Sequence, residues 1–174
     1  MFTPGALLFD MDGLMVDSEP LWFAAERDLA QSLGSDWSHA EAQASTGTGL
    51  RAVVRTITAK AGADLTSDEG VARLTERFVA RIDRLEMKPG CRELIDAARA
   101  ARVPIAVASS NERSLVETIL GRFDLVACFD AIVSGSDVKN PKPAPDIFVE
   151  AARQLGVVPE HCVVLEDALA GATA

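Results

Sequence analysis

Two aspartates separated by one residue follow an apolar run near the start of the sequence. The run covers residues 6–9, and Asp10, Asp12 and Gly13 come directly after it. Two carboxylates so close together are costly unless a cation, a proton or a phosphate-binding partner lies nearby. Gly13 lets the backbone turn sharply and bring both side chains towards one pocket. One carboxylate could then attack as a nucleophile while the other acts as general acid and then base. The alternative is a polar turn that ends a core strand.

Three further polar segments carry groups that suit a phosphate or a metal ion. Ser109 follows an apolar run, and its hydroxyl and the adjacent N–H groups could bind a phosphate oxygen or simply cap a helix. Lys142 lies between two prolines, which fix the chain more rigidly than a solvated surface lysine needs. Glu166 and Asp167 follow another apolar run and offer the hard oxygen ligands that Mg²⁺ prefers, unless they form an exposed acidic turn.

Alternating strands and helices must position these groups. Short apolar runs predict buried parallel strands, and the amphipathic segments between them predict crossover helices on both faces of one Rossmann-like sheet. The predicted fold class is therefore α/β. Open parallel sheets bind ligands at the carboxyl ends of their strands, where the polar segments would meet. The predicted strands cover residues 6–9, 104–108, 131–133 and 162–165. One predicted helix begins near residue 90, and two others cover residues 111–121 and 145–155.

The segment after the first motif has a different pattern. Its apolar residues recur at helical spacing, and it contains no convincing strand. Ser38 with Glu41, and Thr66 with Glu69, have the spacing of capping boxes, in which a hydroxyl is followed three residues later by a glutamate. We therefore predict a core domain and an inserted helical domain, which cover residues 1–16 with 87–174 and residues 17–86.

The charge balance limits the classes of partner. The chain has 17 basic and 26 acidic residues, which gives a formal net charge of -9. Such a chain has no basic field to attract nucleic acid, and an anionic membrane surface would repel it. The charge of a phosphate ligand must then be met locally by a metal ion, a lysine and backbone N–H groups.

The three cysteines indicate a reducing compartment. They cannot all pair with one another, and none belongs to a CxxC motif. Cys128 and Cys162 lie beside or within apolar runs, so we expect small buried core residues. The sequence shows neither an export signal nor a stretch long enough to span a membrane. We therefore expect a cytoplasmic protein.

Four segments together resemble the haloacid dehalogenase-like hydrolases, and among them the subgroup of β-phosphoglucomutase and small sugar-phosphate phosphatases. All four motifs of the family are present in order, and the resemblance covers essentially the whole chain. The segments are FDMDGLMVDSE at residues 9–19, VASSN at 107–111, KPAPDIF at 142–148 and LEDALAG at 165–171.

The resemblance implies a role for each catalytic candidate. Asp10 is expected to become an aspartyl phosphate, and Asp12 to protonate the leaving oxygen and then activate the acceptor. Ser109 is expected to hold a phosphoryl oxygen, and Lys142 to neutralise charge around Asp10. The implied reaction is hydrolysis of small phosphorylated metabolites, with sugar phosphates as the expected substrates.

The resemblance also implies a Mg²⁺ cofactor. Its expected ligands are Asp10, the carbonyl of Asp12, Asp167 and, directly or through water, Glu166. Physical reasoning gives the same requirement, because an acidic cluster acts on an anion only with a cation between them. The helical insertion resembles the mobile cap of the family, which closes over the site and excludes water.

Substrate recognition is expected from the cap and from the segment after Ser109. In the cap, Gly47 lies where the family presents a substrate-reading loop, and Arg51 either contacts a polar group or remains solvated. In the core, the candidates are Ser110 and Asn111. The mutases of the family tend to carry a histidine where a gapless alignment places Trp22, which favours a phosphatase. The alternative is a β-phosphoglucomutase-type transfer between sugar hydroxyls.

Other interpretations concern the type of module and the end of the chain. A signalling receiver also phosphorylates an aspartate with Mg²⁺, but Asp12 and the helical insertion argue against it. Members of the family continue beyond the last motif, so we expect C-terminal strands to be missing after Ala174 and residues 162–165 to have an open edge. The expected partner is a small phosphorylated metabolite, and the expected assembly is a monomer, with a homodimer as the alternative.

Overall fold

The computed structural model describes residues 4–46 and 49–174. Four strands form one sheet in the order β3-β2-β1-β4, and every neighbouring pair is parallel. The predicted α/β fold class is therefore confirmed. The strands are β1 (Ala6–Phe9), β2 (Ile105–Ser109), β3 (Ala131–Ser134) and β4 (Cys162–Leu165).

The chain divides into two compact units. One unit comprises Met1–Asp17 with Glu86–Ala174 and contains the sheet, and the other comprises Ser18–Leu85. The described residues of each unit pack around an apolar core of their own. That the second unit acts as a mobile cap remains a prediction.

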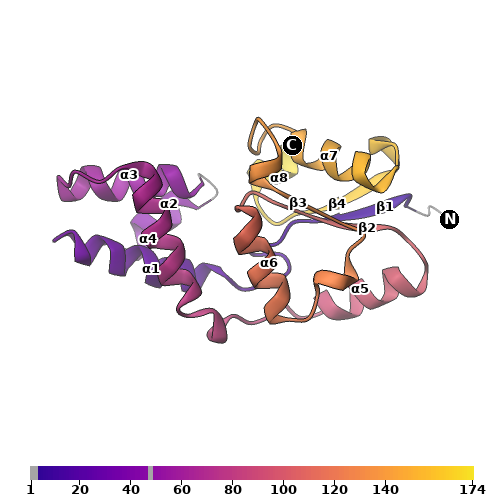
Figure 1. The fold of residues 1–174 in the computed structure, drawn as a ribbon, viewed down its shortest axis with the longest axis horizontal. Coiled ribbons are helices and arrows are strands. Elements are labelled where there is room, and N and C mark those ends of the chain that lie inside the picture. The colour runs from indigo at the N-terminus through magenta and orange to yellow at the C-terminus, as the bar shows by residue number, and fades with distance from the viewer. Residues whose placement is uncertain (1–3, 47–48) are drawn as a thin grey trace. The chain divides into compact units, whose positions relative to one another are not determined.

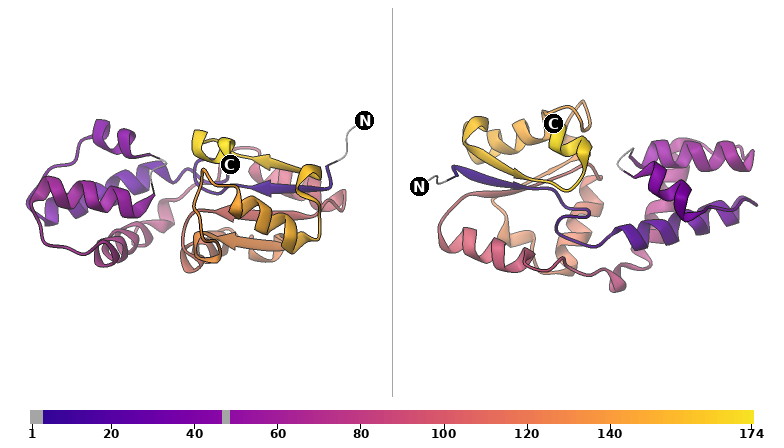
Figure 2. Two further views of the ribbon diagram at one scale, coloured as in Figure 1. Left: turned by 90° about the horizontal axis from the view of Figure 1, so that it is seen from above. Right: turned by 180° about the vertical axis from the view of Figure 1, so that it is seen from behind.

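Helices cover both faces of the sheet (Figures 1 and 2). One face carries α7 (Asp146–Leu155), which packs against β1, β2 and β3, and the other carries α5 (Cys91–Ala100) and α6 (Arg113–Arg122). Strands that are covered on both sides are apolar throughout, which explains their uninterrupted apolar runs. The remaining elements of this unit are α8 (Leu169–Thr173) and 3-10 turns at Val126–Cys128, Gly135–Asp137 and Pro159–His161.

The strand register sets the level at which the polar segments leave the sheet. Phe9 lies opposite Val107 of β2 and Leu165 of β4. The N–H of Asp10 donates to the carbonyl of Leu165 at 3.0 Å, so the first catalytic candidate is fixed at the carboxyl end of β1. β2 has the predicted length but lies one residue later than predicted, because it begins at Ile105 and Ser109 continues the ladder with β3.

Helices are the regular elements of the second unit, and no strand occurs among its described residues. Its elements are α1 (Glu19–Ser32), α2 (His39–Ser45), α3 (Leu50–Ala61), α4 (Ser67–Val79) and a 3-10 turn at Ile82–Arg84. The Ser38 and Glu41 capping box forms as predicted. At the other predicted box, the Thr66 hydroxyl accepts from the Glu69 N–H, but the Glu69 carboxylate binds Arg73. The second box is therefore only half formed.

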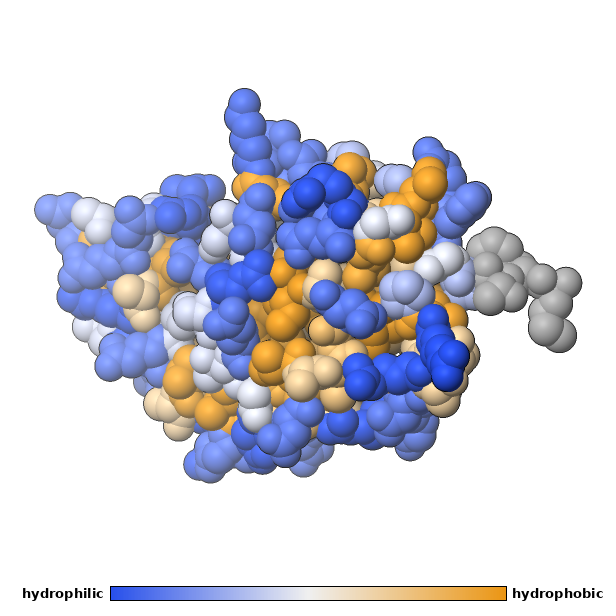
Figure 3. Space-filling model, turned by 45° about the vertical axis from the view of Figure 1, so that its right-hand side comes forward, coloured by the Kyte–Doolittle hydropathy of each residue, from blue (hydrophilic) through white to orange (hydrophobic). Residues whose placement is uncertain are grey.

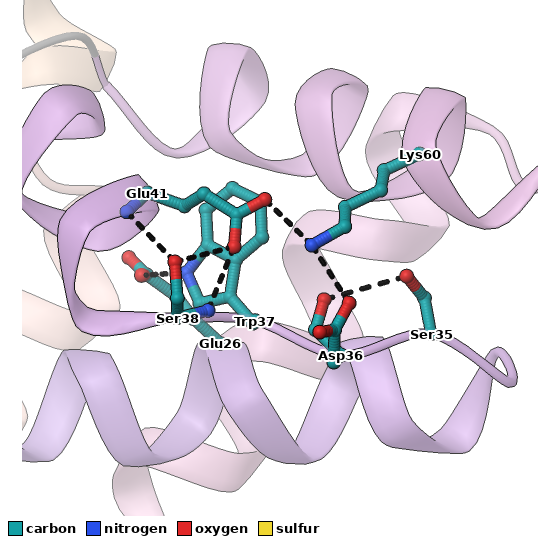
Figure 4. Close-up of polar contacts among 7 residues, drawn as sticks. All are labelled: Glu26, Ser35, Asp36, Trp37, Ser38, Glu41 and Lys60. Atoms are coloured by element: carbon teal, nitrogen blue, oxygen red, sulfur yellow. Dashed lines mark hydrogen bonds and ion pairs between the residues drawn. The ribbon is translucent and has the colours of Figure 1, made fainter.

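A polar cluster ties the connection between α1 and α2 to α3 (Figure 4). Lys60 Nζ lies 2.8 Å from Asp36 Oδ1 and 2.6 Å from Glu41 Oε1. The hydrogen bond from Lys60 and two hydrogen bonds from Ser38 lower the pKa of Glu41 to about 2. Beside it, buried Trp37 donates Nε1–H to Glu26 Oε2 at 2.8 Å. Burial raises the pKa of Glu26 although that hydrogen bond opposes the shift.

The cysteines are less buried than predicted. All three are free thiols, and Cys91 is buried, whereas Cys128 and Cys162 are half-buried. The prediction of buried core residues was therefore wrong for the last two, because Cys128 lies in a 3-10 turn and Cys162 in β4, an edge strand of the described sheet.

The visible surface is mostly hydrophilic, with apolar patches between the charged residues (Figure 3). The largest exposure among the bulky apolar side chains of the described residues is that of Leu169, at 84%. Within that part of the chain, no helix combines the length and the apolar character that crossing a membrane requires.

Candidate active site

Lys142 joins two carboxylates at the carboxyl ends of β1 and β4. Its Nζ lies 2.5 Å from Asp10 Oδ1 and 2.7 Å from Glu166 Oε2. The three side chains are only 5–10% exposed. On its other side, Nζ lies 4.8 Å from the centre of the Phe148 ring, a cation–π contact that also excludes water. The predicted candidates Asp10, Lys142 and Glu166 are therefore brought together in one buried cluster.

Burial is the largest influence on the pKa of Asp10. It raises the pKa of Asp10 to about 7, although the Lys142 ammonium and its hydrogen bond lower it; the carboxylates of Glu166 and Asp12 raise it further. Removing a charged group from water disfavours its ionised form, and one lysine does not fully compensate for two more acids. The carboxylate of Asp10 is therefore poised to exchange its proton for another positive charge.

Asp10, Glu166 and Asp167 form a group with the composition of a metal site. One carboxylate oxygen of each lies within 4.8 Å of those of the other two. Hard carboxylate oxygens are the ligands that Mg²⁺ prefers, so the residues present fit the predicted cofactor. The carboxylate of Asp12 does not belong to the group; the ligand predicted from Asp12 is its backbone carbonyl, and it stays a prediction.

Two glycines make room for this group. Gly13 has a φ of +82°, and a Cβ at this position would lie 2.1 Å from Asp167 Oδ2. From the sequence, Gly13 is expected to allow a sharp turn; the structure shows in addition that only glycine leaves room for the Asp167 carboxylate. A Cβ at Gly171 would lie 1.9 Å from Glu166 Oε2. A larger residue at either glycine would therefore displace Asp167 or Glu166 from its position.

Asp12 points to the segment that follows β2. Its Oδ2 accepts a hydrogen bond from Asn111 Nδ2 at 2.6 Å. Ser109 is 1% exposed, and its hydroxyl accepts the Asn111 N–H at 3.2 Å. Ser110 is exposed at the same edge. The predicted phosphate contact of Ser109 and the predicted substrate contacts of Ser110 and Asn111 stay predictions.

The candidates in the helical unit have different surroundings. Arg51 is exposed and forms an ion pair with Asp68 at the start of α4. Gly47 lies outside the described residues. Trp22, which the sequence alignment predicts in place of a histidine of the mutases, is half-buried and stacks on buried Phe78 with ring centroids 4.1 Å apart.

Some residues around the site carry no recognisable signal in the sequence. Phe148 belongs to the KPAPDIF motif, but its spacing predicts only a helix face that packs against the sheet. Gly171 is one glycine in a small-residue segment, and its contact with Glu166 depends on how the chain turns after β4. The bond between Asp12 and Asn111 joins residues 99 positions apart, so only the register of β1 and β2 reveals it.

Comparisons with known proteins identify the family of the chain. The family model of the haloacid dehalogenase-like hydrolases matches residues 4–174. Hexitol phosphatase B of Escherichia coli strain K12 is 36% identical over 98% of this chain and 80% of its own length. The phosphorylated carbohydrates phosphatase of Thermotoga maritima is 33% identical over 97% of this chain and 79% of its own.

Solved structures give the same result. The crystal structure of CbbY from Rhodobacter sphaeroides in complex with phosphate superposes with a TM-score of 0.88 at 32% identity, and covers 98% of this chain and 81% of its own. A putative β-phosphoglucomutase from Thermotoga maritima gives a TM-score of 0.78 at 32% identity, over 97% of this chain and 78% of its own.

Proposed function

The chain belongs to the haloacid dehalogenase-like hydrolase family, and from this premise we propose that it is a Mg²⁺-dependent phosphatase of small phosphorylated metabolites, with sugar phosphates as its substrates. Its relatives at 33–36% identity include enzymes named as phosphatases of hexitols and of phosphorylated carbohydrates. The observation that carries the proposal is the buried cluster in which Lys142 bridges Asp10 and Glu166. A buried nucleophile beside a fixed ammonium group is the arrangement that phosphoryl transfer requires.

In the first step, Asp10 attacks the phosphorus atom of the substrate. A bond forms between an oxygen of Asp10 and phosphorus, the bond to the leaving oxygen breaks, and Asp12 gives that oxygen its proton. Lys142 neutralises charge on Asp10 and the phosphoryl oxygens, and the Ser109 hydroxyl holds one of those oxygens. The products of this step are the alcohol and an aspartyl phosphate on Asp10.

In the second step, Asp12 acts as a base. It accepts a proton from a water molecule whose oxygen attacks phosphorus, and the bond to Asp10 breaks to release inorganic phosphate. Asp10, Glu166 and Asp167, with the carbonyl of Asp12, would hold Mg²⁺, which would supply positive charge to offset that of the phosphoryl group. Glu166 contributes directly or through water.

The remaining predictions from the sequence belong to the same proposal. Substrate selection involves Ser110 and, from the helical unit acting as a cap, Gly47 and Arg51. For Asn111 the sequence also predicts a substrate contact. The protein works in the cytoplasm as a monomer, or else as a homodimer, on a free metabolite. Phosphate release from a panel of sugar and nucleotide phosphates, with Mg²⁺ and with chelator, tests this function; release that chelator does not affect would contradict it.

A phosphomutase is the second candidate, because a putative β-phosphoglucomutase is among the similar structures. Such an enzyme passes the phosphoryl group from Asp10 to a sugar hydroxyl instead of to water. Trp22 argues against it, because its ring is stacked on Phe78 and it has no imidazole. A hexose 1-phosphate separates the candidates by product, since a phosphatase yields free phosphate and a mutase yields the 6-phosphate.

A further inference from the structure

Asn111 and Asp12 are joined by a short hydrogen bond next to the reaction centre. Asn111 Nδ2 donates to Asp12 Oδ2 at 2.6 Å, and both residues are half-buried. They follow neighbouring parallel strands, since Phe9 of β1 lies opposite Val107 of β2. A hydrogen bond to a charged acceptor is stronger than one between neutral groups, so this contact can orient the carboxylate.

The backbone of Asn111 is itself held from two sides. Its N–H donates to the hydroxyl of Ser109 at 3.2 Å, and its carbonyl accepts the N–H of Gly135 at 2.8 Å. Gly135 approaches so closely that a Cβ there would lie 2.3 Å from the carbonyl oxygen of Ser110. The amide of Asn111 is therefore presented from a fixed point on β2 and β3.

We propose that Asn111 is a positioning residue that orients the carboxyl group of Asp12 for proton transfer. The inference rests on the proposed phosphatase function, in which Asp12 protonates the leaving oxygen and later accepts a proton from water. An amide suits both steps, because it donates to a carboxylate through nitrogen and, when turned, accepts from a carboxylic acid through oxygen. In this role Asn111 acts through Asp12, and not on the substrate as the sequence predicts.

The nature of the leaving group distinguishes a residue that orients Asp12 from a residue that binds the phosphoryl group. A sugar alkoxide needs a proton to leave, whereas p-nitrophenolate leaves without one, so only the sugar substrate depends on an oriented Asp12 in the first step. The value of kcat/KM reports the steps through departure of the leaving group. A residue that binds the phosphoryl group would instead affect both substrates alike, because that group is common to them.

The test compares kcat/KM for a hexose phosphate and for p-nitrophenyl phosphate in wild type, Asn111→Ser and Asn111→Asp. The serine variant keeps a hydroxyl that can bind phosphate, and the aspartate variant keeps the shape of the side chain but lacks the donor. We expect kcat/KM to fall about tenfold or more for the hexose phosphate and less than about threefold for p-nitrophenyl phosphate. Equal falls for both substrates, or no fall for either, would overturn the inference.

Two controls complete the test. Gln154→Ala removes another amide-to-carboxylate hydrogen bond, an exposed one within α7 at 2.8 Å to Glu150, and is expected to leave both values unchanged. Adding Asn111→Ser to Asp12→Asn is expected to cause no further loss on the hexose phosphate, because both changes remove one function; an additive loss would contradict the inference. Wild-type protein that releases phosphate from neither substrate would overturn the proposed function itself, whereas wild-type release with equal falls overturns the role of Asn111 alone.

Discussion

Two lysines in this molecule occupy the same kind of position with opposite consequences. Lys60 of the helical unit lies between Asp36 and Glu41, and Lys142 of the sheet unit lies between Asp10 and Glu166. The two clusters differ in burial, because Lys60 is 33% exposed and Lys142 is 8% exposed.

The difference in burial reverses the effect on the acids. In the exposed cluster the hydrogen bonds of Lys60 dominate, and they hold the pKa of Glu41 at about 2. In the buried cluster desolvation dominates, and it raises the pKa of Asp10 to about 7 in spite of Lys142. The same charge pattern therefore keeps the acids ionised where water reaches it, whereas the buried Asp10 needs a further positive charge to ionise fully at neutral pH.

Removal of Lys142 is expected to have the largest effect. Lys142→Met leaves Asp10 and the transferred phosphoryl group without their ammonium partner, so we expect phosphate release to fall by about 10²–10³-fold or more. Steady-state kinetics with a sugar phosphate, on protein shown to be folded by circular dichroism, measures the loss. Retention of more than a tenth of the activity would show that Lys142 is not part of the reaction centre.

The raised pKa of Asp10 predicts how Mg²⁺ binding depends on pH. The metal must displace the proton of Asp10, so we expect its affinity to fall by about tenfold per pH unit below pH 7 and to level off above it. Calorimetry in buffers of different ionisation enthalpy measures the affinity and the proton that is released. A constant affinity between pH 5 and pH 7 would contradict the assignment of Asp10 as a ligand.

The raised pKa of Glu26 predicts that the stability of the helical unit falls as the pH rises, whereas the affinity for Mg²⁺ is expected to rise. A carboxyl group with a raised pKa binds its proton more tightly in the folded state, so the free energy of unfolding falls as the pH rises past the ordinary range of glutamate. Glu26→Gln keeps an acceptor for Trp37 without the charge, and we expect its melting temperature to gain on wild type from pH 4 to pH 8. Parallel melting profiles would show that the charge of Glu26 costs nothing.

Lys60→Met is expected to have the smallest effect. Its ion pairs are partly solvated, and such pairs contribute little to stability, so we expect phosphate release to stay within about twofold of wild type. Because the pKa of Glu41 would return towards its ordinary range, the variant should lose stability less steeply than wild type as the pH falls from 4.5 towards 2. A loss of activity comparable to that of Lys142→Met would remove the distinction between the clusters.

Much of the sheet unit could be predicted because each buried strand is a short apolar run in the sequence and is followed directly by polar residues. The apolar runs predict each of the four strands to within one residue at either end. The polar residues that follow the runs predict Asp10 and Glu166, and the two flanking prolines single out Lys142. Strand order and register are not local properties, so the bond between Asn111 and Asp12 could not be predicted. The contact of Asp167 with Gly13 depends on them in the same way.

Predictions that depended on exposure were less successful. Cys128 and Cys162 lie next to apolar residues in sequence, but the edge of the sheet and a 3-10 turn leave them half-buried. The second capping box failed for another reason, because Arg73 offers Glu69 a stronger, charged partner than the backbone N–H of Thr66 does. Sequence spacing indicates which partners are within reach, but not which of them prevails.

The most direct test of the central role of Asp10 is to trap the phosphorylated enzyme. Wild type and Asp10→Asn are mixed with a ³²P-labelled sugar phosphate in the presence of Mg²⁺, and the protein is then precipitated with acid. We predict acid-stable label on wild type that is lost on treatment with hydroxylamine, and no label and no phosphate release in the variant. Label or phosphate release that persists in Asp10→Asn would contradict the assignment of Asp10 as the nucleophile.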